Sequence, residues 1–119
     1  MAIKYQQSFI KATKAAAKFL TEHPEKFNYS EIYIPSSMED CGCYLGWIGF
    51  FITNSKFISE FDGIYDVHNF FNFGAVQFYD ALRTHIVGKE FNSLANDKTP
   101  GETLKKFLEM GLYKNLGKK

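Results

Sequence analysis

The apolar residues near the start of the chain recur at intervals of three and four, which is the spacing of one helix face. They are Phe9, Ala12, Ala16, Phe19 and Leu20. Lysines repeat every seven residues on another face, and Pro24 disfavours helical backbone at the residue before it. The pattern therefore predicts a helix over residues 3–22 with one solvated, basic side.

A second helix is predicted over residues 43–52, where apolar side chains surround the helix axis almost completely. Such a segment is buried on most sides. The acids Glu39 and Asp40 precede it and suit the positive end of a helix. Gly46 and Gly49 lower its helix propensity and would let a neighbouring backbone approach closely. We expect this segment to be the central helix of the fold.

Two further helices are predicted in the second half of the chain. A stripe at helical spacing runs up to Gly88 and consists of Phe71, Ala75, Phe78, Leu82 and Ile86. The segment Thr99-Pro100-Gly101-Glu102 then combines a capping Thr, a Pro at the first helical position and a Glu three residues after the cap. This signature begins a last helix, for which Gly111 is the expected stop.

The predicted fold is mainly α, a compact bundle of four to five helices around the buried helix 43–52. It forms a single domain over residues 1–119, with a flexible tail over 113–119. The β-branched and aromatic residues of 29–34 form either a small β element or an extended loop, because one strand cannot make a sheet alone. With 119 residues, 45% of them hydrophobic, the chain can bury a core without disulfides or metal.

Rings are unusually frequent, with thirteen Phe, seven Tyr and one Trp, and charge is unevenly placed. Residues 1–26 carry a net charge of +3, residues 27–66 carry −5, and residues 67–119 carry +3, although the whole chain has only +1. Six of the rings fall between residues 57 and 73, which is too many for one short stretch to bury at once. Aromatic anchors with an acidic rim are typical of a surface that binds a basic protein.

We therefore expect an interface formed by Phe57, Glu60, Phe61, Asp62, Tyr65, Asp66, Phe70 and Phe73. The alternative is that these rings fill the core between helices and that the charge blocks neutralise one another in the folded chain. Direct binding of nucleic acid is disfavoured, because residues 50–79 hold eight of the thirteen Phe but almost no Lys or Arg.

Three short motifs occur in a familiar order along the chain. They are His23-Pro24-Glu25-Lys26-Phe27, Cys41-Gly42-Cys43-Tyr44-Leu45-Gly46-Trp47 and the Thr99-Pro100 helix start. The order resembles a group of small uncharacterised bacterial and bacteriophage proteins with a Cys-Gly and Gly-Trp helix between such flanks. This chain departs from that pattern in having one residue between its cysteines, and Phe and Ile where alanines are common after the Trp. The resemblance implies a phage or mobile-element context and no activity.

A small cysteine-dependent hydrolase is the competing hypothesis. Cys41 precedes an apolar helix, where the helix dipole would stabilise a thiolate, and the segment looks like a shortened papain-type signature. His68 or His85 would be the base, with Asp66 or Asp80 to orient it. The spacing does not match that signature, however, and thiols packed under Trp47 explain the cysteines more simply.

The remaining sequence signals exclude several classes of function. Cys-x-Cys lacks the second ligand pair of a zinc site, and the glycines lie in an apolar segment rather than in a phosphate-binding loop. The longest apolar run is too short to cross a membrane. We predict a non-enzymatic, cytoplasmic protein without cofactor or metal, encoded by a phage and acting on a host defence complex in the host cytoplasm. Self-association into a homodimer is a second form of the same binding function.

Overall fold

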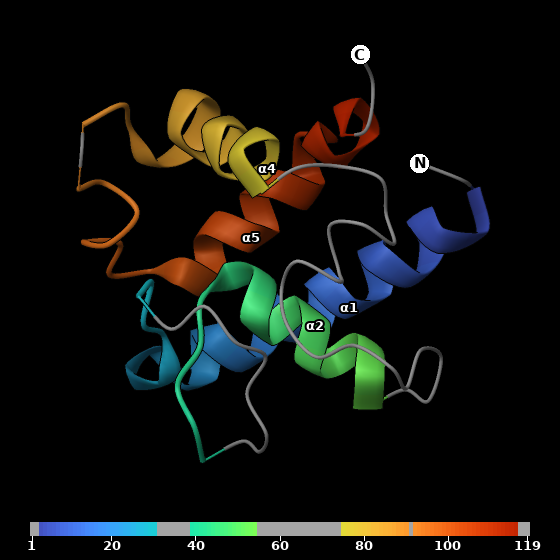
Figure 1. Ribbon diagram of the computed structural model, residues 1–119, viewed down its shortest axis with the longest axis horizontal. Helices are drawn as coiled ribbons and strands as arrows, with labels where there is room; N and C mark the ends of the chain where they lie inside the picture. The colour runs from blue at the N-terminus through green and yellow to red at the C-terminus, as the bar shows by residue number, and fades with distance from the viewer. Residues whose placement is uncertain (1–2, 31–38, 55–74, 91, 117–119) are drawn as a thin grey trace.

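The computed structural model describes residues 3–30, 39–54, 75–90 and 92–116. Within these ranges the chain forms the helices α1 (Ile3–Glu22), α2 (Tyr44–Asn54), α4 (Ala75–Leu82) and α5 (Pro100–Glu109), shown in Figure 1. Three shorter turns, η1 (Pro24–Lys26), η2 (Arg83–Val87) and η3 (Leu112–Asn115), join or extend them. The prediction of a mainly α bundle is confirmed.

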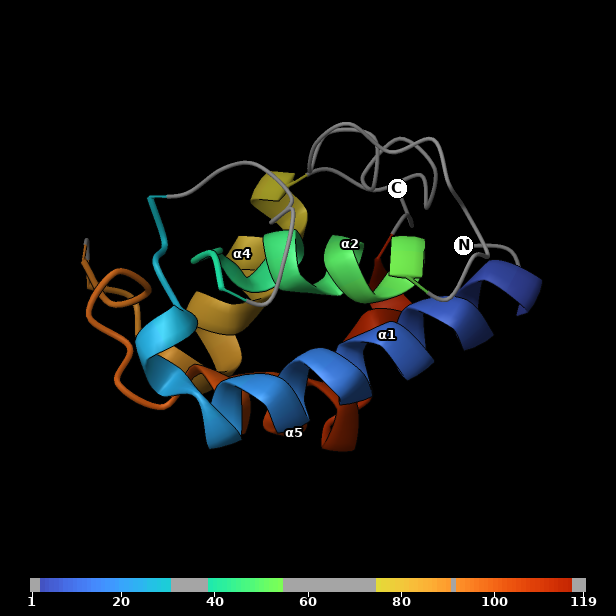
Figure 2. The same cartoon turned by 90° about the horizontal axis from the view of Figure 1, so that it is seen from below.

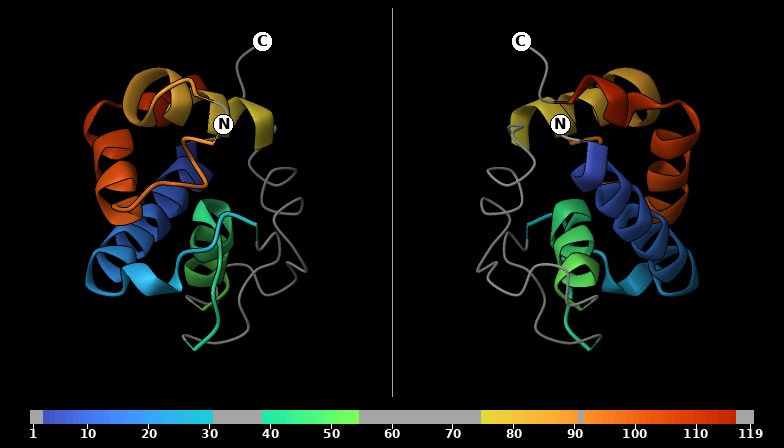
Figure 3. Two further views of the ribbon diagram at one scale, coloured as in Figure 1. Left: turned by 90° about the vertical axis from the view of Figure 1, so that its left-hand side faces the viewer. Right: turned by 90° about the vertical axis from the view of Figure 1, so that its right-hand side faces the viewer.

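Helix α1 follows the apolar stripe that predicts it. Phe9, Ala16 and Leu20 are fully buried, whereas the lysines at 11, 14 and 18 are exposed. Thr13 is also buried, and its hydroxyl donates a hydrogen bond to Phe9 O at 2.7 Å within the same helix. The helix lies between α2 and α5 (Figures 2 and 3) and packs along both.

Helix α2 is buried on almost every side, as its all-round apolar pattern requires. All residues from 42 to 50 are buried, and only Phe51 among residues 42–52 is half-buried. Trp47 stacks on Phe19 of α1 with 4.4 Å between ring centroids. Its indole Nε1 donates to Lys26 O at 3.1 Å, so the one polar atom of this ring is satisfied inside the core. The prediction of a helix buried on most sides is confirmed, whereas among the described helices it is α1 that lies between two others.

Three phenylalanine rings from different helices pack together in the core. They are Phe9, Phe78 and Phe107, and we call them the phenylalanine triad. All three are fully buried and come from α1, α4 and α5. Phe78 lies 5.1 Å from Phe107 and 6.5 Å from Phe9, each pair in an edge-to-face arrangement. Because this geometry suits the aromatic quadrupole, the triad ties three helices together at one point.

Helices α1 and α5 approach each other most closely at Gly101. A Cβ added there would lie 2.6 Å from Ala17 O and would also collide with the side chain and backbone of Thr21. Gly101 is therefore a packing residue as well as part of a helix start. The same role for Gly46 and Gly49 in α2 stays a prediction.

Several predicted helix ends need refinement. Helix α4 continues directly as the π-helical turn η2. Gly88 ends this turn with φ 122°, a conformation that favours glycine. Thr99 occupies the N-cap of α5, but its side chain makes no capping hydrogen bond. Gly111 adopts φ 68° after α5, as a helix stop should.

The described part of the predicted tail packs on the core. Residues 112–115 form η3, Tyr113 lies against the core and Leu116 is buried. Residues 117–119 of the predicted tail lie outside the described ranges. In the predicted β element, Tyr29 and Ser30 form a turn, and residues 31–34 lie outside the described residues. The strand-like pairing that the described residues contain is a single parallel bridge between Phe27 and Gly42.

Candidate functional site

The predicted interface lies between α2 and α4, outside the residues that the structure describes. Its members are Phe57, Glu60, Phe61, Asp62, Tyr65, Asp66, Phe70 and Phe73, and His68 lies in the same stretch. On either side of that stretch, Ile52 of α2 and Phe78 of α4 are buried in the core. The segment thus connects two helices that are both anchored in the core.

The two cysteines occupy different environments. Cys41 is exposed, and its Sγ donates a hydrogen bond to Glu25 O at 3.7 Å. Cys43 is buried at the N-cap of α2, where its Sγ accepts a hydrogen bond from Gly46 N at 3.3 Å. The thiol at the helix N-terminus is therefore Cys43, and the expectation of a buried structural thiol holds for Cys43 but not for Cys41.

Burial raises the pKa of the Cys43 thiol above its ordinary value of 9.0, and this effect outweighs the hydrogen bonds from Tyr79 and from the backbone that lower it. The thiolate is the reactive form of cysteine. Cys43 is therefore a thiol held neutral inside the protein, which fits a structural role.

The described histidines lie at the surface. His23 and Glu25 are 3.5 Å apart and both are exposed, so their attraction is largely screened by water. His85 is exposed in η2. In the ranges that the structure describes, no three side chains of His, Cys, Asp or Glu come together as a metal site would need.

Three tyrosine rings pack together next to Cys43, and we call Tyr29, Tyr44, Tyr79 and Cys43 the tyrosine cluster. Tyr79 lies with its ring centroid 5.5 Å from that of Tyr29 and 6.3 Å from that of Tyr44. Its hydroxyl is 3.5 Å from Cys43 Sγ. Arg83 donates to the Tyr29 hydroxyl at 3.2 Å, which connects the cluster to η2. These residues come from the turn after η1, from the start of α2 and from α4.

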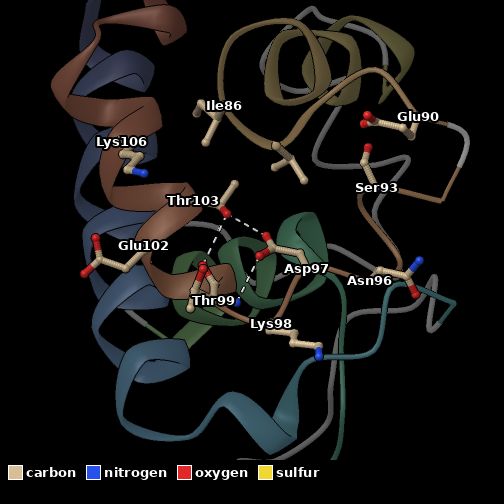
Figure 4. Close-up of a pocket in the computed structure, with 11 residues that line it drawn as sticks. Ile86, Glu90, Ser93, Asn96, Asp97, Lys98, Thr99, Glu102, Thr103 and Lys106 are labelled. Atoms are coloured by element: carbon tan, nitrogen blue, oxygen red, sulfur yellow. Dashed lines mark hydrogen bonds between the residues drawn. The ribbon is translucent and has the colours of Figure 1, made fainter.

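Asp97 connects the tyrosine cluster to the start of α5. Its Oδ2 accepts hydrogen bonds from the Tyr44 hydroxyl and from the Thr103 hydroxyl, each at 2.5 Å. Its Oδ1 accepts one from Thr99 N at 3.0 Å (Figure 4). The sequence interpretation gave the capping role to Thr99, but its side chain makes no capping hydrogen bond. Asp97 instead accepts from the backbone N–H of Thr99 itself, because an Asp side chain readily bonds the backbone N–H two residues later.

Both deeply placed tyrosines have a raised pKa. For Tyr44 the causes are burial first, then the hydrogen bond and the negative charge of Asp97. For Tyr79 they are burial first, then its contact with Cys43. Tyr44, Tyr79 and Cys43 are therefore neutral over the physiological range, and the cluster forms a hydrogen-bonded contact between helices.

A cavity of about 430 Å³ opens beside Asp97, between η2, the loop that follows it and α5. Figure 4 shows Glu90 and Ser93 on one wall and Thr103 and Lys106 of α5 on the other. A second hollow of about 300 Å³ lies between α1 and α5, with Lys14, Lys18 and Lys105 among its lining residues. The sequence pattern predicted neither. The first is lined by residues 86–106, and the second by residues 14–22 of α1 together with residues 102–108 of α5.

No helix among the described residues is both long enough and apolar enough to span a membrane. Comparison of the chain with protein-family models, with curated proteins and with solved structures finds no match.

Proposed function

We propose that this chain is a non-enzymatic protein-binding module that recognises a basic surface on its partner. The binding residues are the aromatic and acidic side chains between α2 and α4, with Phe61, Asp62, Tyr65 and Asp66 at their centre. A host defence complex that handles nucleic acid is a concrete partner, since such complexes present basic surfaces. That choice also rests on the resemblance to small bacterial and bacteriophage proteins.

The observation that carries the proposal is that the aromatic rings of the described residues fall into a buried group and a half-exposed group. Rings that fit a helical stripe or belong to α2, such as Phe9, Trp47 and Phe78, are mostly buried in the core, with Phe51 half-buried. Phe27 and Tyr29 fit no stripe and stay half-exposed at its edge. Residues 57–73 hold six rings with three acids among them, more rings than one short stretch can bury at once, so some of these rings should keep surface free for contact.

Charge supports the same proposal. The interface residues lie in or beside the block of residues 27–66, whose net charge is −5. Complementary charge between partners speeds their encounter and selects among them. An acidic surface on a protein of near-zero net charge should therefore bind basic proteins in preference to acidic ones, with an affinity that falls as salt rises.

Capture of partners from a bacterial lysate, quantified by mass spectrometry, tests the proposal through charge reversal. The double variant Asp62→Lys and Asp66→Lys should lose the proteins that the parent chain retains. Glu25→Lys with Glu109→Lys is the matched control, because both residues are exposed in described parts of the chain and the charge change is the same. Equal losses from both variants, or retention by the first, would contradict the proposal. Light scattering on the same variants reports whether the retained partner is a second copy.

The competing thiol hydrolase keeps one favourable observation, the exposure of Cys41. Alkylation at neutral pH separates the two functions. A binding module predicts that Cys41 reacts at the rate of an ordinary exposed thiol and that Cys43 reacts only on unfolding. Much faster labelling of Cys41, together with a hydrolytic activity lost in Cys41→Ala, would favour the enzyme instead.

A further inference from the structure

We propose that the hollow between α1 and α5 binds the acidic block, residues 27–66, of a second copy of this chain. The proposal rests on the function proposed above and deepens it, because it names a basic surface that the chain itself carries. We call the hollow the lysine groove. It measures about 300 Å³, Ala17 and Leu108 give it an apolar floor, and its basic lining residues are Lys14, Lys18 and Lys105.

The two helices that form the lysine groove run antiparallel. Gly101 at the start of α5 meets Ala17 and Thr21 in the last turns of α1. At the other end of the pair, the ring of Phe107 lies 6.3 Å from that of Phe9. The end of α1 therefore lies beside the start of α5.

Two glutamates also line the groove, and both lie toward one end of it. Glu22 is the last residue of α1 and Glu102 is in the first turn of α5, so both are near the Gly101 contact. Lys14 lies about two turns from Glu22, and Lys105 about one turn from Glu102, each away from that contact. The groove therefore has an acidic end and a basic end, and an acidic segment is attracted to the basic end.

The basic end has no counter-charge of its own. None of the lysines at 14, 18 and 105 forms an ion pair with another described residue. Lys14 and Lys18 share one face of α1 with about 5–6 Å between their Cβ atoms, and the exposed Lys11 extends this row by one turn. Glu109 follows Lys105 by four residues, but it neither lines the groove nor pairs with these lysines. Acidic side chains of a bound partner would supply the missing charge.

A second copy carries that charge. Residues 27–66 have a net charge of −5, although the whole chain has only +1. In one copy, the described parts of this block, residues 27–30 and 39–54, lie beside one another, with Asn28 N donating to Gly42 O at 2.9 Å. They include α2, which lies across α1 from α5 (Figures 2 and 3), and none of them lines the groove. The groove is therefore open to the block of another copy.

Light scattering coupled to size-exclusion chromatography of the intact chain tests this binding. In about 0.05 M NaCl we expect a mass that rises above the 13.7 kDa of one chain as protein concentration increases. In about 0.5 M NaCl the mass should fall toward that of one chain, because salt screens exposed charges. A parent chain that stays monomeric at every concentration would overturn the proposal.

Charge reversal assigns the two sides of the contact. Lys14→Glu with Lys18→Glu should abolish the association, and so should Asp62→Lys with Asp66→Lys. An equimolar mixture of these two double variants should restore it, because the intact block of the first fits the intact groove of the second. The matched control reverses two exposed lysines that do not line the groove, Lys89→Glu with Lys98→Glu. An equal loss in the control, or a mixture that stays monomeric, would overturn the proposal.

The same variants separate this proposal from the one on which it rests. If the parent is monomeric but Asp62→Lys with Asp66→Lys loses the proteins captured from lysate, the proposed function stands and the binding of a second copy is wrong. If that double variant keeps both its captured proteins and its association, both proposals are wrong.

Discussion

The phenylalanine triad and the tyrosine cluster are two aromatic regions of the same bundle, and they hold helices together in different ways. The triad of Phe9, Phe78 and Phe107 contains only rings, all fully buried. The tyrosine cluster carries hydroxyls and a thiol, and each polar atom needs a partner, among them Asp97 and Arg83. The stability of the first region depends on how well its rings fill the core. The stability of the second depends on hydrogen bonds to residues outside the cluster, such as Asp97 and Arg83.

This difference decides how each region should respond to mutation. Removal of a ring from the triad leaves a cavity, and the loss scales with the volume removed. Removal of one partner from the cluster leaves buried donors or acceptors unsatisfied, while replacement of both partners can be nearly neutral. Alkaline pH should affect only the cluster, because only its side chains titrate. Four measurements compare how the stability of the protein depends on the two regions.

Phe78→Ala should have the largest effect. The ring is fully buried and contacts both other members of the triad, so its removal should lower the free energy of unfolding by about 3–5 kcal/mol. Urea denaturation followed by circular dichroism measures this loss. Met110→Ala is the control, because Met110 is 52% exposed and should change stability by less than about 0.5 kcal/mol. Similar losses of unfolding free energy in the two variants would show that the triad is not a main part of the core.

Asp97→Ala should cost about 2–3 kcal/mol, because it leaves the hydroxyl of Tyr44 and the amide of Thr99 without their acceptor. The matched control is Asp80→Ala. Asp80 is exposed, and its pair with Arg83 at 3.3 Å should contribute at most about 1 kcal/mol. In a Tyr44→Phe background the loss from Asp97→Ala should shrink, and a double-mutant cycle measures that coupling. Strict additivity would contradict the connection between the cluster and α5.

Stability should fall as the pH rises above about 10. The folded-state pKa values of Tyr44 and Tyr79 lie above the 10.0 of an unfolded tyrosine. Their contribution is therefore complete below pH 10 and is lost as the pH rises further, by up to about 1.4 kcal/mol per pH unit for each group. Urea midpoints between pH 8 and 11.5 measure the slope. Tyr44→Phe should have a shallower slope, and an unchanged slope would show that this tyrosine titrates normally.

Tyr79→Phe should have the smallest effect, about 1 kcal/mol or less. The substitution keeps the ring contacts with Tyr29 and Tyr44 and removes only the weak contact with Cys43, whose Sγ still accepts from Gly46 N. Thermal unfolding measures the change. A loss as large as that of Asp97→Ala would mean that the contact between hydroxyl and thiol is a main support of the cluster.

The two regions also differ in how far sequence reasoning could reach them. Helical spacing identified Phe9 and Phe78 as core residues, because a ring that repeats at three and four must face one side of its helix. It could not find Asp97, because that role depends on where Tyr44 and Thr103 meet in space. The segment Asp97-Lys98-Thr99 does carry a local signal, since Asp bonds the amide two residues on. That signal predicts the hydrogen bond from Thr99 N to Asp97 but not the one from Tyr44.

Gly101 and Leu116 show the same limit. Gly101 reads locally as part of a helix start, and only the approach of α1 makes its missing Cβ necessary. Leu116 follows a helix stop in a basic end of the chain, which favours a tail, yet it is buried. Long-range packing decided both positions.

The direct test of the central proposal compares stability with binding in the double variant Phe61→Ala and Tyr65→Ala, with Phe78→Ala as the core reference. If the rings of residues 57–73 serve recognition, the double variant should melt within about 3 °C of the parent chain, which corresponds to under about 1 kcal/mol, and should lose its partner or its self-association. A drop in melting temperature as large as that of Phe78→Ala would show instead that these rings are core, and would contradict the proposal.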